Sequence, residues 1–167
     1  MKAKMSKLLV GVLLLALGPW STLSAADIEK PDWLKNRRKK HPFGLNVGIL
    51  GPTGWGFVSA DYFIDSKLDL EGGMGIQTNG IHPYSFFAGA KYHLAGKFIM
   101  GSTFYFGAMD AFFFKDGKGY QHNLYFPIGI HKIKRNKFSW SLEVAYQFNK
   151  NSDSNIWGAF KVGYRIF

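Results

Sequence analysis

The sequence predicts an all-β fold, an eight-stranded antiparallel up-and-down β-barrel. Apolar residues alternate with polar or small residues over eight segments, which is the two-residue period of a strand with one apolar face. Turn-forming residues separate these segments, and an even number of strands can close an antiparallel sheet. Because the apolar phase is rich in aromatic residues, and each segment has the roughly 10-residue length of a tilted spanning strand, we expect a transmembrane barrel.

The first 26 residues have the pattern of a secretory signal peptide. Three lysines among the first seven residues precede an apolar run, Leu8–Leu17, and the small residues Ser24, Ala25 and Ala26 predict cleavage before Asp27. A retained N-terminal anchor is the alternative, but the run is shorter than the about 20 residues of a spanning helix. Cleavage leaves 141 residues and lowers the net charge from +10 to +7. This length suits one domain or one small barrel.

Residues 27–42, DIEKPDWLKNRRKKHP, form a basic N-terminal segment that we expect in the periplasm. Six basic residues outnumber three acidic ones, and the segment has few large apolar side chains. Charge runs of this kind are usually solvated and partly disordered. The alternative is an arm that rests on phosphate headgroups with Trp33 at the interface. The absence of cysteine excludes a lipid anchor and disulfides.

The barrel is expected over residues 43–167. Its predicted strands are 43–50, 55–64, 67–77, 84–94, 97–107, 120–130, 137–148 and 156–167. Gly51-Pro52-Thr53-Gly54 predicts the first turn and Asp65-Ser66 the second. Ala95-Gly96 predicts a two-residue hairpin turn after the fourth strand. The longest loop is expected at residues 108–119.

The third strand has the clearest alternation. Its apolar phase consists of Leu68, Leu70, Met74 and Ile76. Its other phase carries Lys67, Asp69 and Glu71, which neither an apolar core nor lipid would accept, so that face must meet water or charged partners. The last two strands repeat the pattern, with Phe138, Trp140, Leu142, Val144, Tyr146 and Phe148 on one face of the seventh strand.

Three stretches resemble the small outer-membrane β-barrel proteins of Gram-negative bacteria. They are YFIDSKLDLEGGMGI at 62–76, YFPIGIH at 125–131 and the final GYRIF. The resemblance covers about residues 43–167 and implies an eight-stranded barrel in the cell outer membrane, in contact with lipid and lipopolysaccharide. It also implies insertion by the outer-membrane assembly machinery, which reads a terminal aromatic residue, here Phe167. We expect a monomer with no cofactor and no nucleic-acid partner.

The predicted connections also fit such a barrel. Those after the second, fourth and sixth strands are expected to be short, and those after the third, fifth and seventh longer. Short periplasmic turns, longer outer loops and periplasmic termini give this asymmetry in outer-membrane barrels. Phe167 shares a phase with Arg165 and not with Ile166, so either a bulge resets the end of the last strand or the aromatic signal is read less strictly.

The inward phase predicts a charge network in the barrel lumen. Its four acids and four bases are Asp61, Lys67, Asp69, Glu71, Lys91, Glu143, Lys161 and Arg165. Unpaired charges there would be costly, and an eight-stranded barrel has just enough interior for its own side chains. We therefore expect a filled polar lumen and no wide pore; a narrow conduit or a polar ligand cavity is the alternative.

Phe112, Phe113 and Phe114 are predicted to be exposed in the longest loop. Such a patch could bind a partner. It could equally extend the outer aromatic girdle and rest on lipid.

No catalytic motif is evident, and we expect a structural or surface-interaction role. One alternative is a lipid A-modifying enzyme, a deacylase or acyltransferase, with outer-loop candidates His82, His122, Ser152 or Ser154, and Asp110 or Asp153. His93 and His131 are predicted near periplasmic turns, where they would cap or be solvated. No metal-binding spacing is present. The other alternative is a soluble lipocalin-like barrel whose apolar phase of the third strand lines a ligand cavity.

Overall fold

The computed structural model describes residues 37–76, 84–94, 98, 101–115, 119–149 and 155–166. The chain divides into two compact units, Met1–Lys30 and Pro31–Phe167, and all described residues belong to the second. The predicted signal peptide, residues 27–36 of the basic segment and the predicted assembly signal Phe167 lie outside the described residues.

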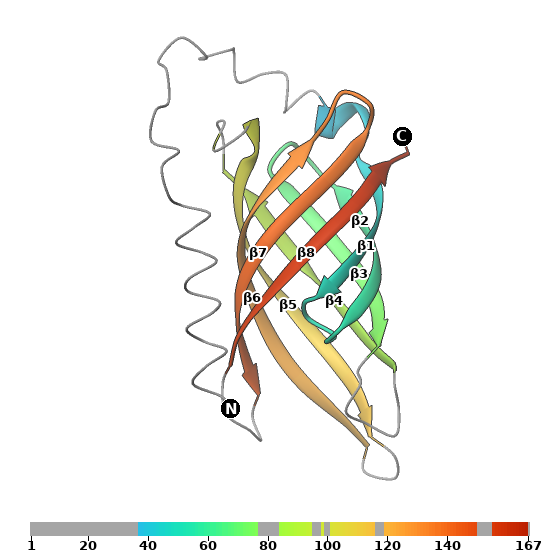
Figure 1. The fold of residues 1–167 in the computed structure, drawn as a ribbon, viewed down its shortest axis with the longest axis vertical. Coiled ribbons are helices and arrows are strands. Elements are labelled where there is room, and N and C mark those ends of the chain that lie inside the picture. The colour runs from blue at the N-terminus through green and yellow to red at the C-terminus, as the bar shows by residue number, and fades with distance from the viewer. Residues whose placement is uncertain are drawn as a thin grey trace. The chain divides into compact units, whose positions relative to one another are not determined.

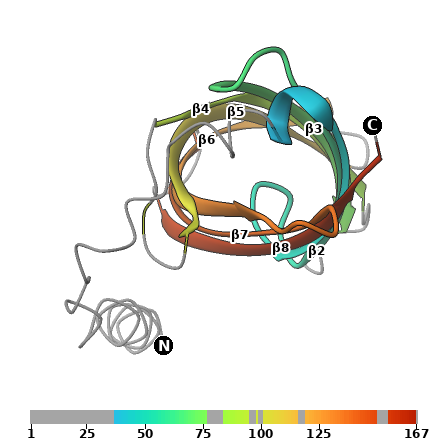
Figure 2. The same ribbon diagram turned by 90° about the horizontal axis from the view of Figure 1, so that it is seen from above.

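Eight strands form one closed antiparallel barrel in chain order, as the alternation predicted. Figure 1 shows β8 beside β1, and Figure 2 shows the closed ring from above. The first and last strands pair from Gly44–Arg165 to Leu50–Ala159, so the barrel has no open sheet edge. The strands are β1 (Phe43–Leu50), β2 (Gly56–Phe63), β3 (Leu68–Ile76), β4 (Tyr84–His93), β5 (Thr103–Lys115), β6 (Gly119–Ile133), β7 (Phe138–Asn149) and β8 (Asn155–Arg165).

The fifth strand lies later in the chain than predicted. β5 runs to Lys115 and β6 begins at Gly119, so the predicted long loop 108–119 is mostly strand. The alternation simply continues through it, with Met109 buried inside and Phe114 exposed outside. β4 ends at His93 and β5 begins at Thr103, and His93 pairs in register with Tyr105, so the two strands do not meet in the register that a two-residue turn at 95–96 requires. Ala95 and Gly96 themselves lie outside the described residues.

The predicted asymmetry of the connections is also wrong at two positions, after β4 and after β5, whereas the strand bounds keep the predicted order after β2, β3, β6 and β7. The connection after β5 comprises only residues 116–118, and the one after β4 is the longest. Asp110, a residue type that is depleted in strands, lies within the stretch that was predicted as a loop. Asp110 instead occupies an outward position of β5, paired in register with Leu124 of β6.

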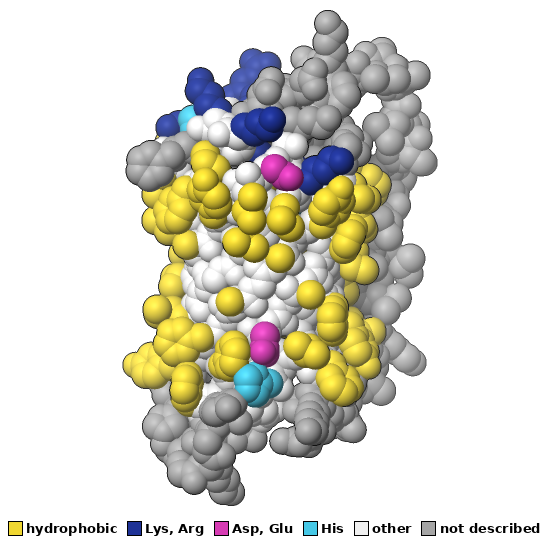
Figure 3. All heavy atoms as spheres, turned by 180° about the vertical axis from the view of Figure 1, so that it is seen from behind, with side chains coloured by type: hydrophobic (Ala, Val, Ile, Leu, Met, Phe, Trp, Pro, Cys, Tyr) yellow, Lys and Arg dark blue, Asp and Glu magenta, His cyan; other side chains and the backbone are white. Residues whose placement is uncertain are grey.

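The outer wall of the barrel is apolar on every strand. One large apolar side chain from each strand, 41% to 50% exposed, illustrates this: Leu45, Val58, Leu70, Phe86, Phe106, Leu124, Leu142 and Phe160. Figure 3 shows apolar side chains gathered in two bands on one face, with basic side chains beyond one of them. Leu70, Met74 and Ile76 belong to this wall, so they do not line the internal cavity that a lipocalin-like barrel requires.

The interior contains a polar part and an apolar part. The apolar cluster includes Phe57 of β2 and Phe87 of β4, whose rings meet edge to face at 5.6 Å between centroids. Its other members are Met109, Ala111, Phe113, Tyr125, Ala145 and Ala159. The polar part lies toward the end of the barrel at which the described chain begins, and it contains the charged residues.

Candidate functional site in the barrel interior

Two glutamates and two lysines form the centre of the polar interior. Lys161 Nζ lies 2.8 Å from Glu71 Oε2 and 3.4 Å from Glu143 Oε2. Lys91 contacts Glu71 closely and lies 3.6 Å from Glu143 Oε2. These four residues come from β3, β4, β7 and β8, and each is at most 5% exposed. Each ammonium thus lies between two carboxylates, which compensates for the cost of burying all four charges.

Neutral hydroxyl groups satisfy the remaining carboxylate oxygens. Ser59 Oγ donates to Glu71 Oε1 at 2.7 Å. Tyr125 Oη donates to Glu143 Oε1 at 3.1 Å, and Tyr105 Oη donates to the other oxygen of Glu143. Because these donors are themselves buried, the network is held in one arrangement by packing as well as by hydrogen bonds.

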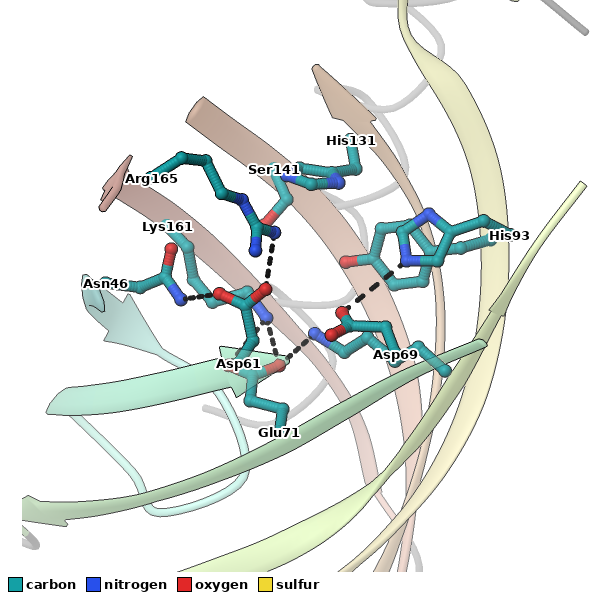
Figure 4. Close-up of a pocket in the computed structure, with 11 residues that line it drawn as sticks. Asn46, Asp61, Asp69, Glu71, His93, His131, Ser141, Lys161 and Arg165 are labelled. Carbon is teal, nitrogen blue, oxygen red and sulfur yellow. Dashed lines mark hydrogen bonds and ion pairs between the residues drawn. The ribbon is translucent and has the colours of Figure 1, made fainter. Parts of the chain in front are cut away.

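A second ion pair lies nearer the barrel end. Arg165 of β8 pairs with Asp61 of β2, and Asn46 Nδ2 donates to Asp61 Oδ1 at 2.6 Å. Arg165 also donates to the carbonyl oxygen of Pro42 at 2.8 Å. Figure 4 shows Asn46, Asp61 and Arg165 converging beside Glu71 and Lys161.

The described part of the basic segment closes this end. Residues 37–40 form a helical turn, and Figure 2 shows it at the rim of the barrel. Arg38 is only 2% exposed. Its guanidinium donates to the carbonyl oxygen of Ser66 at 2.8 Å and to Thr103 Oγ1, and it lies 4.9 Å from the centre of the Phe63 ring. This part of the basic segment packs against the end of the barrel, so the expectation that the segment is solvated is wrong for Arg38.

The charge of Arg38 is retained in this position. Burial lowers the pKa of its guanidinium to about 10, an effect that Asp69 opposes and Arg165 increases. At neutral pH Arg38 is therefore still a cation. Next to it, Arg37 donates to the carbonyl oxygen of Ile133 at 3.0 Å, which ties the same turn to the end of β6.

Seven of the eight predicted lumen charges lie inside the barrel, and Lys67 does not. Lys67 is only partly buried in the connection after β2, with Nζ 6.0 Å from the centre of the outward-facing Tyr92 ring. Arg38 supplies the fourth internal cation in its place. The prediction assigned Lys67 to β3 by extending the alternation one residue too far.

His93 and His131 are buried in the interior, contrary to the prediction that they cap turns or are solvated. They are 1% and 8% exposed, and their ring centroids lie 5.4 Å apart. His93 Nδ1 lies 3.0 Å from Arg38 Nη2. Its Nε2 lies 3.6 Å from Asp69 Oδ2. The signal was present in the sequence, because both histidines continue the inward phase of their strands.

The space left between these side chains is small. A cavity of about 20 Å³ lies among Asp61, Asp69, Glu71, His93, His131 and Arg165. This is room for about one water molecule. At this level the described interior therefore has no room for a small-molecule ligand.

The predicted exposed aromatics Phe112, Phe113 and Phe114 are all in β5 and not in a loop. Phe113 is 5% exposed and belongs to the apolar cluster inside the barrel, whereas Phe114 is 48% exposed on the outer wall. The Phe112 ring packs against His122 at 4.6 Å between centroids. The three residues thus alternate between the two faces and do not form one patch.

Two of the predicted catalytic candidates come together. His122 Nδ1 and Asp110 Oδ2 lie 3.2 Å apart, with side chains 46% and 36% exposed on the outer face of β6 and β5. His82, Ser152, Asp153 and Ser154 lie outside the described residues. No group of three or more histidine or acidic residues among the described residues is arranged to hold a metal ion.

No protein-family model, curated protein or solved structure matches this chain. Within the described part of the chain, no helix is both long enough and apolar enough to cross a membrane.

Proposed function

We propose that this protein is an integral barrel of the Gram-negative outer membrane, with a structural or surface-interaction role. The observation that carries the proposal is the distribution of side chains between the two faces of the sheet. Large apolar residues are exposed on all eight strands, while seven charged residues from five of these strands, β2, β3, β4, β7 and β8, are buried inside. A water-soluble barrel would have the opposite arrangement, because monomers rarely expose a contiguous apolar surface of more than a few hundred Å².

Closure of the sheet supports the same proposal. In a bilayer every backbone polar group must be paired within the protein, and a closed barrel does this. The pairing of β1 with β8 completes the ring of hydrogen-bonded strands. The predicted signal peptide would direct the chain to export and to the outer-membrane assembly machinery. The inserted barrel would be a monomer surrounded by outer-membrane lipid and lipopolysaccharide.

The filled interior argues against transport. The ion pairs among Glu71, Lys91, Glu143 and Lys161 and the apolar cluster around Phe57 and Phe87 occupy successive levels of the lumen. Opening a path would require separating buried charges. We therefore propose that the barrel is a scaffold and not a pore.

The proposal is tested by fractionation and heat-modifiability on an SDS gel. The chain is produced with its own N-terminal segment in a Gram-negative host. We expect it in the outer-membrane fraction, with a band that migrates differently before and after boiling. Recovery of soluble, folded protein from the periplasm without detergent would contradict the proposal.

A lipid A-modifying activity is the second candidate, and one observation favours it. The Asp110–His122 pair lies on the outer wall, where it could meet a lipid substrate, and a histidine that a carboxylate orients is the general base of many hydrolases. The nucleophile would have to come from Ser152 or Ser154 in the connection after β7. A deacylase and acyltransferase assay on the purified protein and its His122→Ala variant tests this, and equal product from both would reject it.

A further inference from the structure

An apolar groove crosses the outer wall over β8, β1, β2 and β3. Its volume is about 700 Å³, within the roughly 300–1,000 Å³ range of ligand pockets. Ala60 and Gly72, which pair in register, form its low part. Larger side chains that project outward line the groove beside them, namely Val58, Met74 and Tyr164, which are 50%, 52% and 53% exposed.

The register of the sheet explains the groove. Phe138 pairs with Tyr164, Tyr164 with Leu45, Leu45 with Ala60, and Ala60 with Gly72. Along this row the outward side chains decrease in size, from the aromatic rings of Phe138 and Tyr164 to Gly72, which has no side chain. The wall is therefore lowest at β2 and β3, and the groove ends against the rings of β7 and β8.

The aromatic end of the groove carries positive charge. Phe138 directly follows the turn at 134–137, which is held by hydrogen bonds from Lys134 N to Phe138 O at 2.7 Å and from Lys137 N to Lys134 O at 3.2 Å. Lys134 Nζ lies 5.3 Å from the centre of the Phe138 ring. Residues 132–137 contain four basic residues and no acidic one.

We propose that this groove binds one phospholipid with an anionic headgroup. Its acyl chain lies along Ala60 and Gly72, and its phosphate meets Lys134 beyond Phe138. The inference rests on the proposed membrane location. The lining is apolar along its length and cationic at one end, which matches a lipid with a single charged end. Each basic residue near a membrane surface adds about 1 kcal/mol to the binding of anionic lipid, or about fivefold in affinity.

The test uses protein reconstituted in vesicles that contain phosphatidylglycerol and phosphatidylcholine. Native mass spectrometry then measures which lipid stays bound after the vesicles are dissolved. We expect one phosphatidylglycerol to be retained in preference to phosphatidylcholine. Lys134→Gln should weaken this preference about fivefold. The double variant Ala60→Leu with Gly72→Leu should abolish retention of either lipid by filling the groove.

A matched control separates groove filling from general damage. A Cβ added at Gly72 meets only the Phe87 carbonyl oxygen at 3.6 Å, and one at Gly158 meets only the Glu143 carbonyl oxygen at 3.5 Å, so neither outward position obstructs the Cβ of a leucine. Gly158→Leu lies outside the groove and should retain phosphatidylglycerol fully. Flotation with the vesicles and heat-modifiability, read on the same samples, report whether each variant is inserted.

Two outcomes would overturn the inference while leaving the proposed function intact. The first is an inserted double variant that retains phosphatidylglycerol as well as Gly158→Leu does. The second is a wild-type protein that forms a dimer and a double variant that no longer does so but retains lipid as before. That result would assign the groove to a second copy of the chain. Failure of the wild-type protein to float with vesicles would instead reject the membrane location itself.

Discussion

Arg38 donates a hydrogen bond from Nη2 to Nδ1 of His93 at 3.0 Å, 55 residues away in the sequence. Because a guanidinium has only donors, Nδ1 of His93 must accept and Nε2 must carry the proton. That N–H faces Asp69, whose nearer oxygen lies 3.6 Å from Nε2. A residue that precedes the barrel thus fixes the tautomer of a buried histidine and completes the balance of internal charge.

Replacing Arg38 by alanine should destabilise the barrel by about 2–4 kcal/mol, because it leaves the carbonyl oxygen of Ser66 and Nδ1 of His93 without their donor and removes a buried cation that interacts with Asp69. The measurement is urea unfolding of the refolded barrel in lipid or detergent, followed by circular dichroism. Arg38→Lys should recover only part of the loss, since an ammonium cannot reproduce the planar fork. The exposed neighbour is the control: Lys39→Ala should change stability by less than about 0.5 kcal/mol. Equal effects of the two alanine variants would show that Arg38 does not anchor the turn.

The central network should be strongly coupled. Glu71→Gln removes the charge that Lys91 and Lys161 share and should cost about 3–5 kcal/mol. Combining it with Lys161→Met should recover part of this loss, because the second change removes an ammonium that the first left without compensation. A double-mutant cycle on the free energy of unfolding should give a coupling above about 1 kcal/mol. Additive effects would mean that Glu71 and Lys161 act independently.

Alternation predicted the strands and their faces because a barrel wall enforces a strict two-residue period. The alternation alone correctly predicted a strand from Phe138 to Phe148 of β7 and the inward position of Glu143. The prediction failed at residues 108–115, where β5 continues through a stretch that was predicted as a loop. Strand ends are harder to predict than strand faces because hairpin geometry, not face polarity, decides where pairing stops.

The candidate site was predictable only in part for a different reason. The alternation within each strand predicted that three residues of the site point into the lumen, namely Asp61, Glu71 and Arg165. Arg38 belongs to a charge run that has no periodicity, and only the structure shows that it folds into the barrel end. The pairing of Asp110 with His122 depends on the register between β5 and β6, and a misplaced β5 concealed it.

Two adjacent glycines of β3 should respond oppositely to alanine. A methyl group at the inward Gly73 would lie 2.3 Å from the Val58 carbonyl oxygen and 2.8 Å from Ser59 Cβ. Gly73→Ala should therefore cost about 1–3 kcal/mol through overpacking. Gly72→Ala points outward, meets nothing closer than 3.6 Å and should be neutral or slightly stabilising. Unfolding midpoints of the two variants in one detergent make the comparison, and equal losses would contradict the assignment of faces.

An arginine on the outer wall provides a test of the bilayer itself. Val47 is 55% exposed and pairs with Val162 and Val58 on either side, in the middle of β1. If lipid surrounds the barrel, Val47→Arg should lower the free energy of unfolding in vesicles by about 2–4 kcal/mol, the cost of a cation near the bilayer midplane.

Ile64→Arg is the matched control, because Ile64 is equally exposed at 55% but lies just beyond β2, beside the basic end of the barrel. It should cost only about 0–1 kcal/mol, as cations near the interface do. In water the two arginines would be equivalent surface substitutions, each within about 0.5 kcal/mol. A larger loss of unfolding free energy for Val47→Arg than for Ile64→Arg therefore supports the membrane location. Two small, equal losses in vesicles would show that lipid does not surround the apolar wall.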